Sequence, residues 1–309
     1  MASASHPAAL DPELLASIEA HAADLAARAG NLLLSYFPRP LEVAYKSKDH
    51  ANPVTEADRA SEKLLVEGIG ERFPSHAILS EEAPDTPTAT GEFLWVLDPL
   101  DGTTNFLNRF PFWGVSIAVL HQGVPVAAAL FIPALATQGS QVLRARAGAG
   151  AYLGDAPLRL PPEAEASDRR LSAMPAYFWG QFRVRRELRR QIGELRTTGS
   201  IACELALVST GALQFAAFTS PKIWDVAAGL LILQEAGGQT LVRSERRQWK
   251  PFTSFQEPGA GLPLKGDIRE WGASLLVGSP ATVGLVSQGL RPRRGLRRWL
   301  RRLIGRRRR

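Results

Sequence analysis

The chain has 309 residues, 45% of them hydrophobic and 22% charged, which suffices for one large or two moderate globular domains. It lacks an apolar run of the ~18 residues that span a membrane and any cysteine besides Cys203 for a disulfide. We also expect no secretory signal, because the first residues do not combine a basic segment with an apolar run. The net charge of +7 is due to residues 291–309, whose 11 arginines leave 26 basic and 30 acidic residues elsewhere. We therefore expect a mildly acidic cytoplasmic globule with a strongly basic tail.

Helices and strands are predicted to alternate along the chain. Asp11-Pro12 before regularly spaced leucines predicts a capped helix, and Thr55 is the expected N-cap of a second helix. The apolar run 93–97 predicts a buried strand that stops at Asp98, because Pro99 follows. Further expected elements are a hairpin turn at 121–123, helices over 201–208, 226–236 and 280–290, and a strand over 273–277. This alternation favours a layered α/β or α+β fold.

Three acidic clusters follow apolar segments: Ser80-Glu81-Glu82, the segment 98–104, and Trp224-Asp225. Carboxylates gathered in one cleft repel one another and need a cation, and ligation by oxygen alone favours Mg²⁺ or Mn²⁺. The five histidines lie outside these clusters, which argues against zinc and leaves no evident base for a serine or cysteine nucleophile.

The segment Asp98–Thr104 has the spacing of a turn that binds both metal and phosphate. Pro99 forces the chain to turn after the strand, which would direct Asp98, the Leu100 carbonyl and Asp101 at one or two metal ions. Gly102 permits close backbone approach. The N–H groups at the start of the following helix would then bind phosphate; they belong to Gly102, Thr103 and Thr104.

Each motif taken alone has a structural alternative. The pair Glu81-Glu82 could be a solvated loop, and Asp225 could be a helix N-cap worth ~1 kcal/mol. The segment 98–104 could be a structural turn or a calcium loop. All three alternatives would have to hold together for a metal site to be absent.

Four motifs, in this order, resemble the inositol monophosphatase family: PVTEAD (53–58), SEE (80–82), LDPLDGTTNF (97–106) and WDVAAG (224–229). The resemblance extends over residues 14–290. It implies an α-β-α-β-α sandwich of the sugar-phosphatase type, two or three Mg²⁺ ions, lithium sensitivity and a homodimer. It also implies a phosphatase domain over 11–290, with a metal and phosphate half (11–150) and a substrate half (151–290).

The resemblance assigns roles to individual residues. Metal-ligand positions are matched by Glu81, Asp98, Asp101, Asp225 and the Leu100 carbonyl. Gly102 and Thr103 match the turn that contacts phosphate, and Thr103 with Asp58 or Glu81 would orient and deprotonate the attacking water. Lys46 or Lys48 would lie near the metal site. The implied reaction is hydrolysis of a small phosphomonoester by a metal-activated water, without a covalent phosphoenzyme.

The expected substrate pocket departs from the family pattern. Inositol-directed members carry a glutamate seven residues before the Trp-Asp aspartate, where this chain has Phe218, and a small residue where it has Ile201 after Ser200. We expect Ser200, Ile201 and Phe218 to form a more apolar pocket. A 3′(2′),5′-bisphosphate nucleotidase is the alternative, with a second phosphate held by Arg183, Arg185, Arg186, Arg189 and Arg190 unless these form a solvated face. Inositol phosphates, sugar phosphates and histidinol phosphate also remain as candidate substrates.

The tail has apolar residues at three- and four-residue spacing among its arginines: Leu296, Trp299, Leu300, Leu303 and Ile304. This pattern predicts a basic amphipathic helix that binds an anionic membrane or the nucleic-acid backbone; the alternative is a disordered tail. We expect peripheral attachment at the inner face of the membrane. A non-catalytic membrane- or RNA-binding regulator is the rival of another class, but such a protein has no need of all four acidic residues.

Overall fold

The computed structural model describes residues 10–39, 43–45, 53–83, 91–138, 140–161, 166–175, 182–186, 188–243, 248–256 and 268–292. Lys46, Lys48 and residues 293–309 lie outside this part of the chain, and so do the predictions made for them. Within the described residues, no helix has the length and apolar character needed to cross a membrane.

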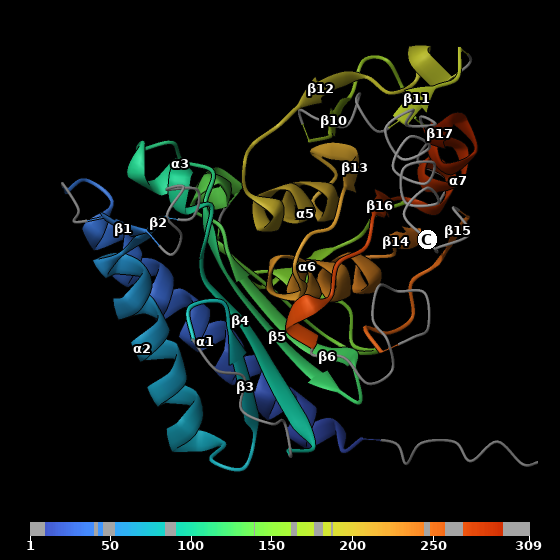
Figure 1. Cartoon of the computed structure of the whole chain (residues 1–309). Helices are drawn as coiled ribbons and strands as arrows, with labels where there is room; N and C mark the ends of the chain where they lie inside the picture. Colours follow the sequence, from blue (N-terminus) through green and yellow to red (C-terminus); the bar gives the residue numbers. More distant parts are fainter. Residues whose placement is uncertain are drawn as a thin grey trace, which may run out of the picture.

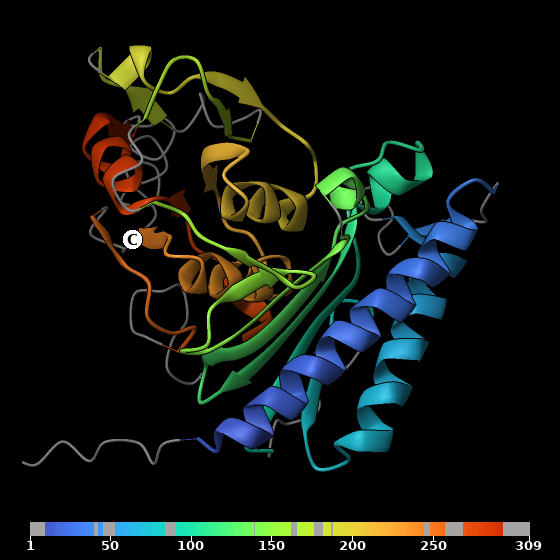
Figure 2. The same ribbon diagram turned by 180° about the vertical axis from the view of Figure 1, so that it is seen from behind.

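Helical layers and β-sheets alternate through the molecule (Figure 1). Helices α1 (Pro12–Tyr36) and α2 (Glu56–Arg72) cover one face of a seven-stranded sheet, as the view from behind also shows (Figure 2). Helices α5 (Ile201–Ser209) and α6 (Ile223–Glu235) lie between this sheet and a six-stranded sheet. Helix α7 (Pro280–Gly289) packs on the other face of the second sheet. The α-β-α-β-α sandwich is therefore confirmed.

The first sheet has the order β3-β4-β5-β6-β7-β8-β9. Only β3 and β4 are parallel; the other neighbours are antiparallel. Its strands are β3 (Ala77–Ser80), β4 (Phe93–Asp101), β5 (Gly114–His121), β6 (Val124–Phe131), β7 (Val142–Arg146), β8 (Ala151–Leu153) and β9 (Ala156–Leu158). The expected hairpin between β5 and β6 is present, with positive φ angles of 51° at Gln122 and 78° at Gly123.

Strand β4 does not stop at Asp98 as predicted but continues to Asp101. The register with β5 shifts between these two aspartates, which pair with Ser116 and Gly114. Such a bulge accommodates Pro99, which has no N–H group for the ladder. It also keeps both aspartates on one strand end instead of separating them by a loop.

The second sheet has the order β12-β10-β13-β16-β14-β15. Its strands are β10 (Leu171–Ala173), β12 (Glu194–Arg196), β13 (Leu213–Phe218), β14 (Gln239–Arg243), β15 (Trp249–Pro251) and β16 (Leu275–Gly278). Two small antiparallel pairs join β1 (Val43–Tyr45) to β2 (Pro53–Thr55) and β11 (Phe182–Val184) to β17 (Leu290–Pro292). Short helices are α3 (Thr103–Leu107), η1 (Pro133–Gln138), η2 (Leu188–Arg190) and η3 (Ile268–Glu270). The division near residue 150 stays a prediction, and β8 and β9 extend the first sheet to Leu158.

The helix ends follow from capping chemistry. The Asp11 carboxylate accepts the Glu13 N–H, and Thr55 and Asp58 form a reciprocal capping box at the start of α2. Helix α6 begins at Ile223, three residues before the predicted start, because the Asp225 carboxylate accepts the Lys222 N–H. Between two sheets this helix is buried on all sides, which explains its continuous apolar sequence.

Candidate metal centre and adjoining cavity

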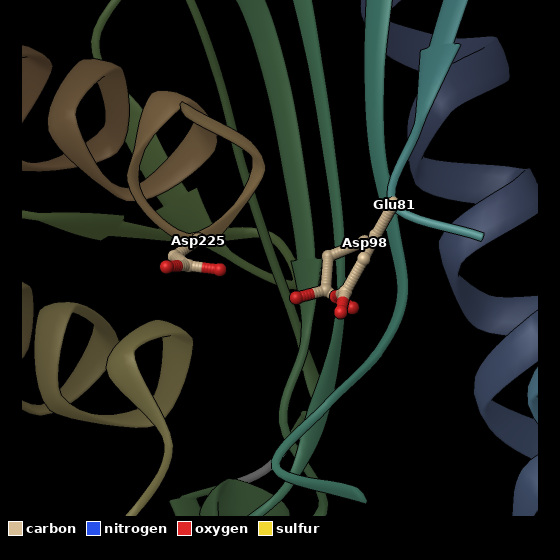
Figure 3. A group of neighbouring side chains, drawn as sticks. All are labelled: Glu81, Asp98 and Asp225. Carbon is tan, nitrogen blue, oxygen red and sulfur yellow. The ribbon is translucent and has the colours of Figure 1, made fainter. Parts of the chain in front are cut away.

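Three carboxylates converge where the first sheet meets α6 (Figure 3). One oxygen each from Glu81, Asp98 and Asp225 lies within 4.8 Å of the others. Glu81 and Asp98 lie side by side at the ends of β3 and β4, and Asp225 faces them from the first turn of α6 (Figure 3). Asp98 is buried, and the other two are partly exposed.

The backbone explains this convergence. Strands β3 and β4 are parallel, so their carboxyl ends meet at one edge of the sheet, and the Glu81 N–H donates to the Leu97 carbonyl at 3.1 Å. Asp225 is fixed from the other side, because its Oδ2 accepts the Lys222 N–H at 2.8 Å. The prediction that Asp225 could be the N-cap is therefore wrong: Lys222 is the N-cap of α6, and Asp225 is the third residue of the helix, whose carboxylate accepts the N-cap N–H and also faces the cluster.

Asp101 is adjacent to the cluster but is held toward α5. Its Oδ2 accepts hydrogen bonds from the Ser200 hydroxyl and from the Ala202 N–H at 2.8 Å. It is not one of the three carboxylates within 4.8 Å, although its charge acts on Asp98 and Asp225. The carbonyl of Leu100, another expected ligand, accepts the Thr103 hydroxyl at 3.2 Å.

Burial and the charges of neighbouring carboxylates make Asp98, Asp101 and Asp225 hard to ionise. Burial, followed by the charge of Glu81, raises the pKa of Asp98 well above its ordinary value. Burial is also the main cause that raises the pKa of Asp225 to about 8 and that of Asp101 to about 6. A donor set made only of oxygens, whose charges a cation would balance, fits a hard divalent ion such as Mg²⁺ better than zinc.

The expected phosphate turn lies beside the cluster. Gly102 has a φ of 85°, and a Cβ there would lie 3.0 Å from the Phe112 carbonyl oxygen, so the position requires glycine. The N–H groups of the first turn of α3 have no partner within that helix. The Thr103 hydroxyl lies 3.1 Å from Asp58 Oδ1, and Asp58 is fixed in turn by Thr55. Burial raises the pKa of Asp58 in spite of these hydrogen bonds.

A cavity of about 290 Å³ adjoins this centre. The three expected pocket residues, Ser200, Ile201 and Phe218, all line it, and Ser200 connects it to Asp101. Thr197, Gly199, Pro175 and Thr219 also line it. Gly199 has a φ of 83° and packs against the Asn105 side chain, which donates to the Thr198 carbonyl.

Sequence reasoning missed Glu204, which lines the same cavity from α5. Its Oε1 accepts the Thr198 N–H at 2.8 Å and the Thr198 hydroxyl at 3.1 Å. Burial raises the pKa of Glu204 to about 7. The sequence feature that could have revealed Glu204 is its position as the single acidic residue of an otherwise apolar predicted helix.

The arginines expected to hold a second phosphate do not line this cavity. Arg183 lies on β11, which pairs with β17. Arg189 and Arg190 lie on η2, which contacts α7. All of the described members of the set are exposed. The solvated-face alternative therefore describes their position better than the phosphate clamp.

Arg269 is a second residue that sequence reasoning missed. Its Nη2 donates to the Ser80 carbonyl at 2.6 Å, and its guanidinium carbon lies 5.5 Å from the centre of the Trp224 ring. Ser80 and Trp224 immediately precede Glu81 and Asp225. Arg269 thus connects the two chain segments that supply the facing carboxylates.

Comparisons with known proteins agree with this architecture. The model of the inositol monophosphatase family matches residues 14–264. An inositol-1-monophosphatase of Rhizobium meliloti is 34% identical over 68% of this chain and 80% of its own length. A putative Nus factor SuhB of Neisseria meningitidis is 33% identical over 72% of this chain and 86% of its own length.

Among solved structures, an inositol monophosphatase from Anabaena has a TM-score of 0.66 and 27% identity, covering 89% of this chain and 96% of that one. The region matched by the family model, residues 14–264, includes the first sheet and the carboxylate cluster, and the family is one of metal-dependent phosphatases. The chain belongs to the inositol monophosphatase family.

Proposed function

We propose that this protein is a Mg²⁺-dependent phosphatase that hydrolyses a small phosphomonoester with water. The observation that carries the proposal is the convergence of Glu81, Asp98 and Asp225 within 4.8 Å. Such a cluster of like charges, partly buried, opposes folding unless a cation binds there. Membership of a phosphatase family supports the same reaction class.

The residues that would hold Mg²⁺ are these three carboxylates together with Asp101 and the Leu100 carbonyl. Bound Mg²⁺ supplies a water of lowered pKa and positive charge beside the leaving oxygen. Asp101 has one oxygen engaged by α5, so Oδ1 is the oxygen that remains for a ligand. Two or three ions, as the family resemblance implies, is a prediction that metal titration would count.

The chain itself supplies the groups that position phosphate and water. We assign phosphate binding to Gly102, Thr103 and Thr104, whose N–H groups open α3. The Thr103 hydroxyl donates toward Asp58 or the Leu100 carbonyl, so its oxygen accepts a hydrogen from the attacking water. Asp58, or Glu81 within the cluster, would take up the proton.

The experiment is phosphate release from a substrate panel at saturating Mg²⁺, with and without Li⁺. The panel contains inositol 1-phosphate, fructose 1,6-bisphosphate, 3′-phosphoadenosine 5′-phosphate and histidinol phosphate. We expect release that Asp225→Asn abolishes, whereas Asp24→Asn, which changes an exposed carboxylate on α1, has no effect. Equal release by wild type and Asp225→Asn would refute the assignment.

The nucleotidase alternative gains no support from the cavity. The described residues that line it include no lysine, arginine or histidine, so a second phosphate would have no cationic partner there. We therefore rank 3′-phosphoadenosine 5′-phosphate below substrates with a single phosphate.

A second proposal concerns binding of the basic tail to a membrane. Strand β17 pairs with β11 so that Arg291 is in register with Arg183, which places the start of the tail beside an exposed arginine. We propose that this combined basic surface binds anionic lipid. Co-sedimentation with anionic vesicles should fall when residues 293–309 are deleted. Unchanged co-sedimentation, or binding to RNA instead of vesicles, would overturn the membrane proposal.

We also propose that the protein forms a homodimer, which light scattering in solution would test.

A further inference from the structure

Each carboxylate of the cluster belongs to a residue that adjoins a backbone carbonyl held by a side chain from another element. The pairs of donor and carbonyl are Arg269 with Ser80, Ser61 with Pro99, and Ser116 with Trp224. Hydrogen bonds of this kind fix how separate elements lie relative to one another. Because the carboxylates come from the ends of β3 and β4 and from the first turn of α6, their spacing depends on such contacts.

Ser116 lies beside both halves of the cluster. It is the register partner of Asp98 in the ladder between β4 and β5, and residues directly opposite on antiparallel strands project from the same face of a sheet. Its buried hydroxyl donates to the Trp224 carbonyl at 2.9 Å, one residue before Asp225 in the first turn of α6. Asp98 and Asp225 face each other between this sheet and α6 (Figure 3). One buried side chain therefore joins the strand that pairs with Asp98 to the helix that carries Asp225.

This hydrogen bond opposes the repulsion within the cluster. The charge of Asp225 acts on Asp98, so without a cation the two carboxylates favour a wider gap between the sheet and α6. The bond from Ser116 to the start of α6 resists that widening. A centre whose ligands keep their spacing before the ion arrives needs less rearrangement on binding, and such preorganisation raises affinity.

The Ser116 hydroxyl matters less to the fold than to this spacing. Trp224 belongs to the first turn of α6, where a carbonyl oxygen also accepts the N–H of the residue four positions later. A carbonyl oxygen can accept two hydrogen bonds, so loss of the hydroxyl does not leave the Trp224 carbonyl unpaired. The variant Ser116→Ala should therefore fold, and an effect on the cluster can be measured in it.

We propose that Ser116 is a positioning residue that sets the separation of Asp98 from Asp225 and thereby the affinity of the cluster for Mg²⁺. It acts through the Trp224 carbonyl on the start of α6. This inference rests on the proposed phosphatase function for the identity of the ion and for the effect on catalysis, but its test measures Mg²⁺ binding without any substrate.

The test is calorimetric titration of Mg²⁺ into the wild type, Ser116→Ala and Ser172→Ala. Ser172 is the matched control, because it is a buried strand serine of the second sheet whose hydroxyl donates to the Ile192 carbonyl at 2.7 Å. We expect Ser116→Ala to lower the affinity for Mg²⁺ by about 10- to 100-fold, as for other groups that orient metal ligands. Ser172→Ala should bind Mg²⁺ like the wild type, although both variants should lose a few degrees in Tm.

A second variant, Ser116→Thr, keeps the hydroxyl on a residue that suits a strand, and it should recover most of the lost affinity. At saturating Mg²⁺, Ser116→Ala should lower kcat and leave KM within a few fold of wild type. Equal affinities of Ser116→Ala and wild type for Mg²⁺, or equal losses in Ser116→Ala and Ser172→Ala, would overturn the inference. Weaker Mg²⁺ binding by Ser116→Ala, together with a wild type that releases no phosphate from any compound, would support the positioning role and refute the phosphatase function.

Discussion

Ser200 lines the cavity and donates to Asp101 beside the carboxylate cluster, yet the two regions differ in the side chains that form them. In the cluster, three carboxylates of like charge face one another, and the strand ends and a helix cap hold them there. In the cavity, Glu204 is the one charged side chain among the described lining residues, and the others are apolar or neutral polar. On the proposed function, the cluster binds a cation whatever the substrate, whereas the cavity selects the alcohol that is accepted.

The largest effect should come from Asp98→Asn. Asn cannot ionise, so the variant avoids the cost of burying a carboxyl group whose pKa is raised by burial and by its neighbours. The metal-free protein should therefore gain about 1 to 3 kcal/mol in free energy of unfolding near neutral pH. The stabilisation that Mg²⁺ gives to the wild type should be lost at the same time. Chemical denaturation with and without Mg²⁺ measures both changes, and a destabilised variant that still responds to Mg²⁺ would contradict this account of the cluster.

Ser200→Ala tests the link between the two regions. Loss of the hydroxyl that donates to Asp101 should lower the affinity for Mg²⁺ by about 10- to 100-fold, measured by calorimetry. Ser200 also caps α5, so about 1 kcal/mol of stability should be lost as well. Ser279→Ala, which removes the equivalent cap of α7, should lose similar stability and bind Mg²⁺ normally. If both variants bind Mg²⁺ equally, the hydroxyl has no role at the cluster.

The pH dependence of stability tests the cavity. Glu204 has a pKa of about 7 in the folded protein and 4.5 as its ordinary value, so the folded state binds more protons between these limits. Wild-type stability should therefore fall, through this group, as pH rises from about 4.5 to about 7. Relative to wild type, Glu204→Gln should gain up to about 3 kcal/mol above pH 7 and nothing below pH 4.5. A gain that is constant with pH would show that Glu204 is not the titrating group.

Arg269→Ala should have the smallest effect. The variant loses the hydrogen bond to Ser80 and the contact with Trp224, about 1 kcal/mol together. Mg²⁺ affinity should fall only a few fold, because the strands and the α6 cap still hold the ligands. Arg28→Ala, which breaks an exposed ion pair with Asp24, is the control and should leave both quantities unchanged. A loss of Mg²⁺ binding as large as that expected for Ser200→Ala would mean that Arg269 is essential to the cluster.

Local sequence pattern indicates the three carboxylates of the cluster, whereas Glu204 in the cavity was not predicted, for a physical reason. Asp98 and Asp101 belong to one short segment, and Glu81 and Asp225 follow apolar runs, so local pattern indicates where they point. The bulge that carries β4 to Asp101 was not predicted, because it depends on pairing with β5.

The cavity depends on tertiary contacts. Glu204 becomes a pocket residue only because α5 packs against β13 and Thr198 binds one of its oxygens. Arg269 reaches Ser80 across 189 positions of sequence, which no local pattern indicates. The arginines of β11 and η2 lie near the cavity residues in sequence, but their pairing with β17 places them elsewhere.

The most direct test of the metal-dependent phosphatase account is phosphate release measured across a Mg²⁺ titration that begins in EDTA. Wild type and the exposed-site variant Asp24→Asn should be inactive in EDTA and should gain activity together as Mg²⁺ is added. Asp98→Asn should stay inactive at every Mg²⁺ concentration while remaining folded. Phosphate release by the wild type in EDTA, or release by Asp98→Asn at the wild-type rate, would contradict the account.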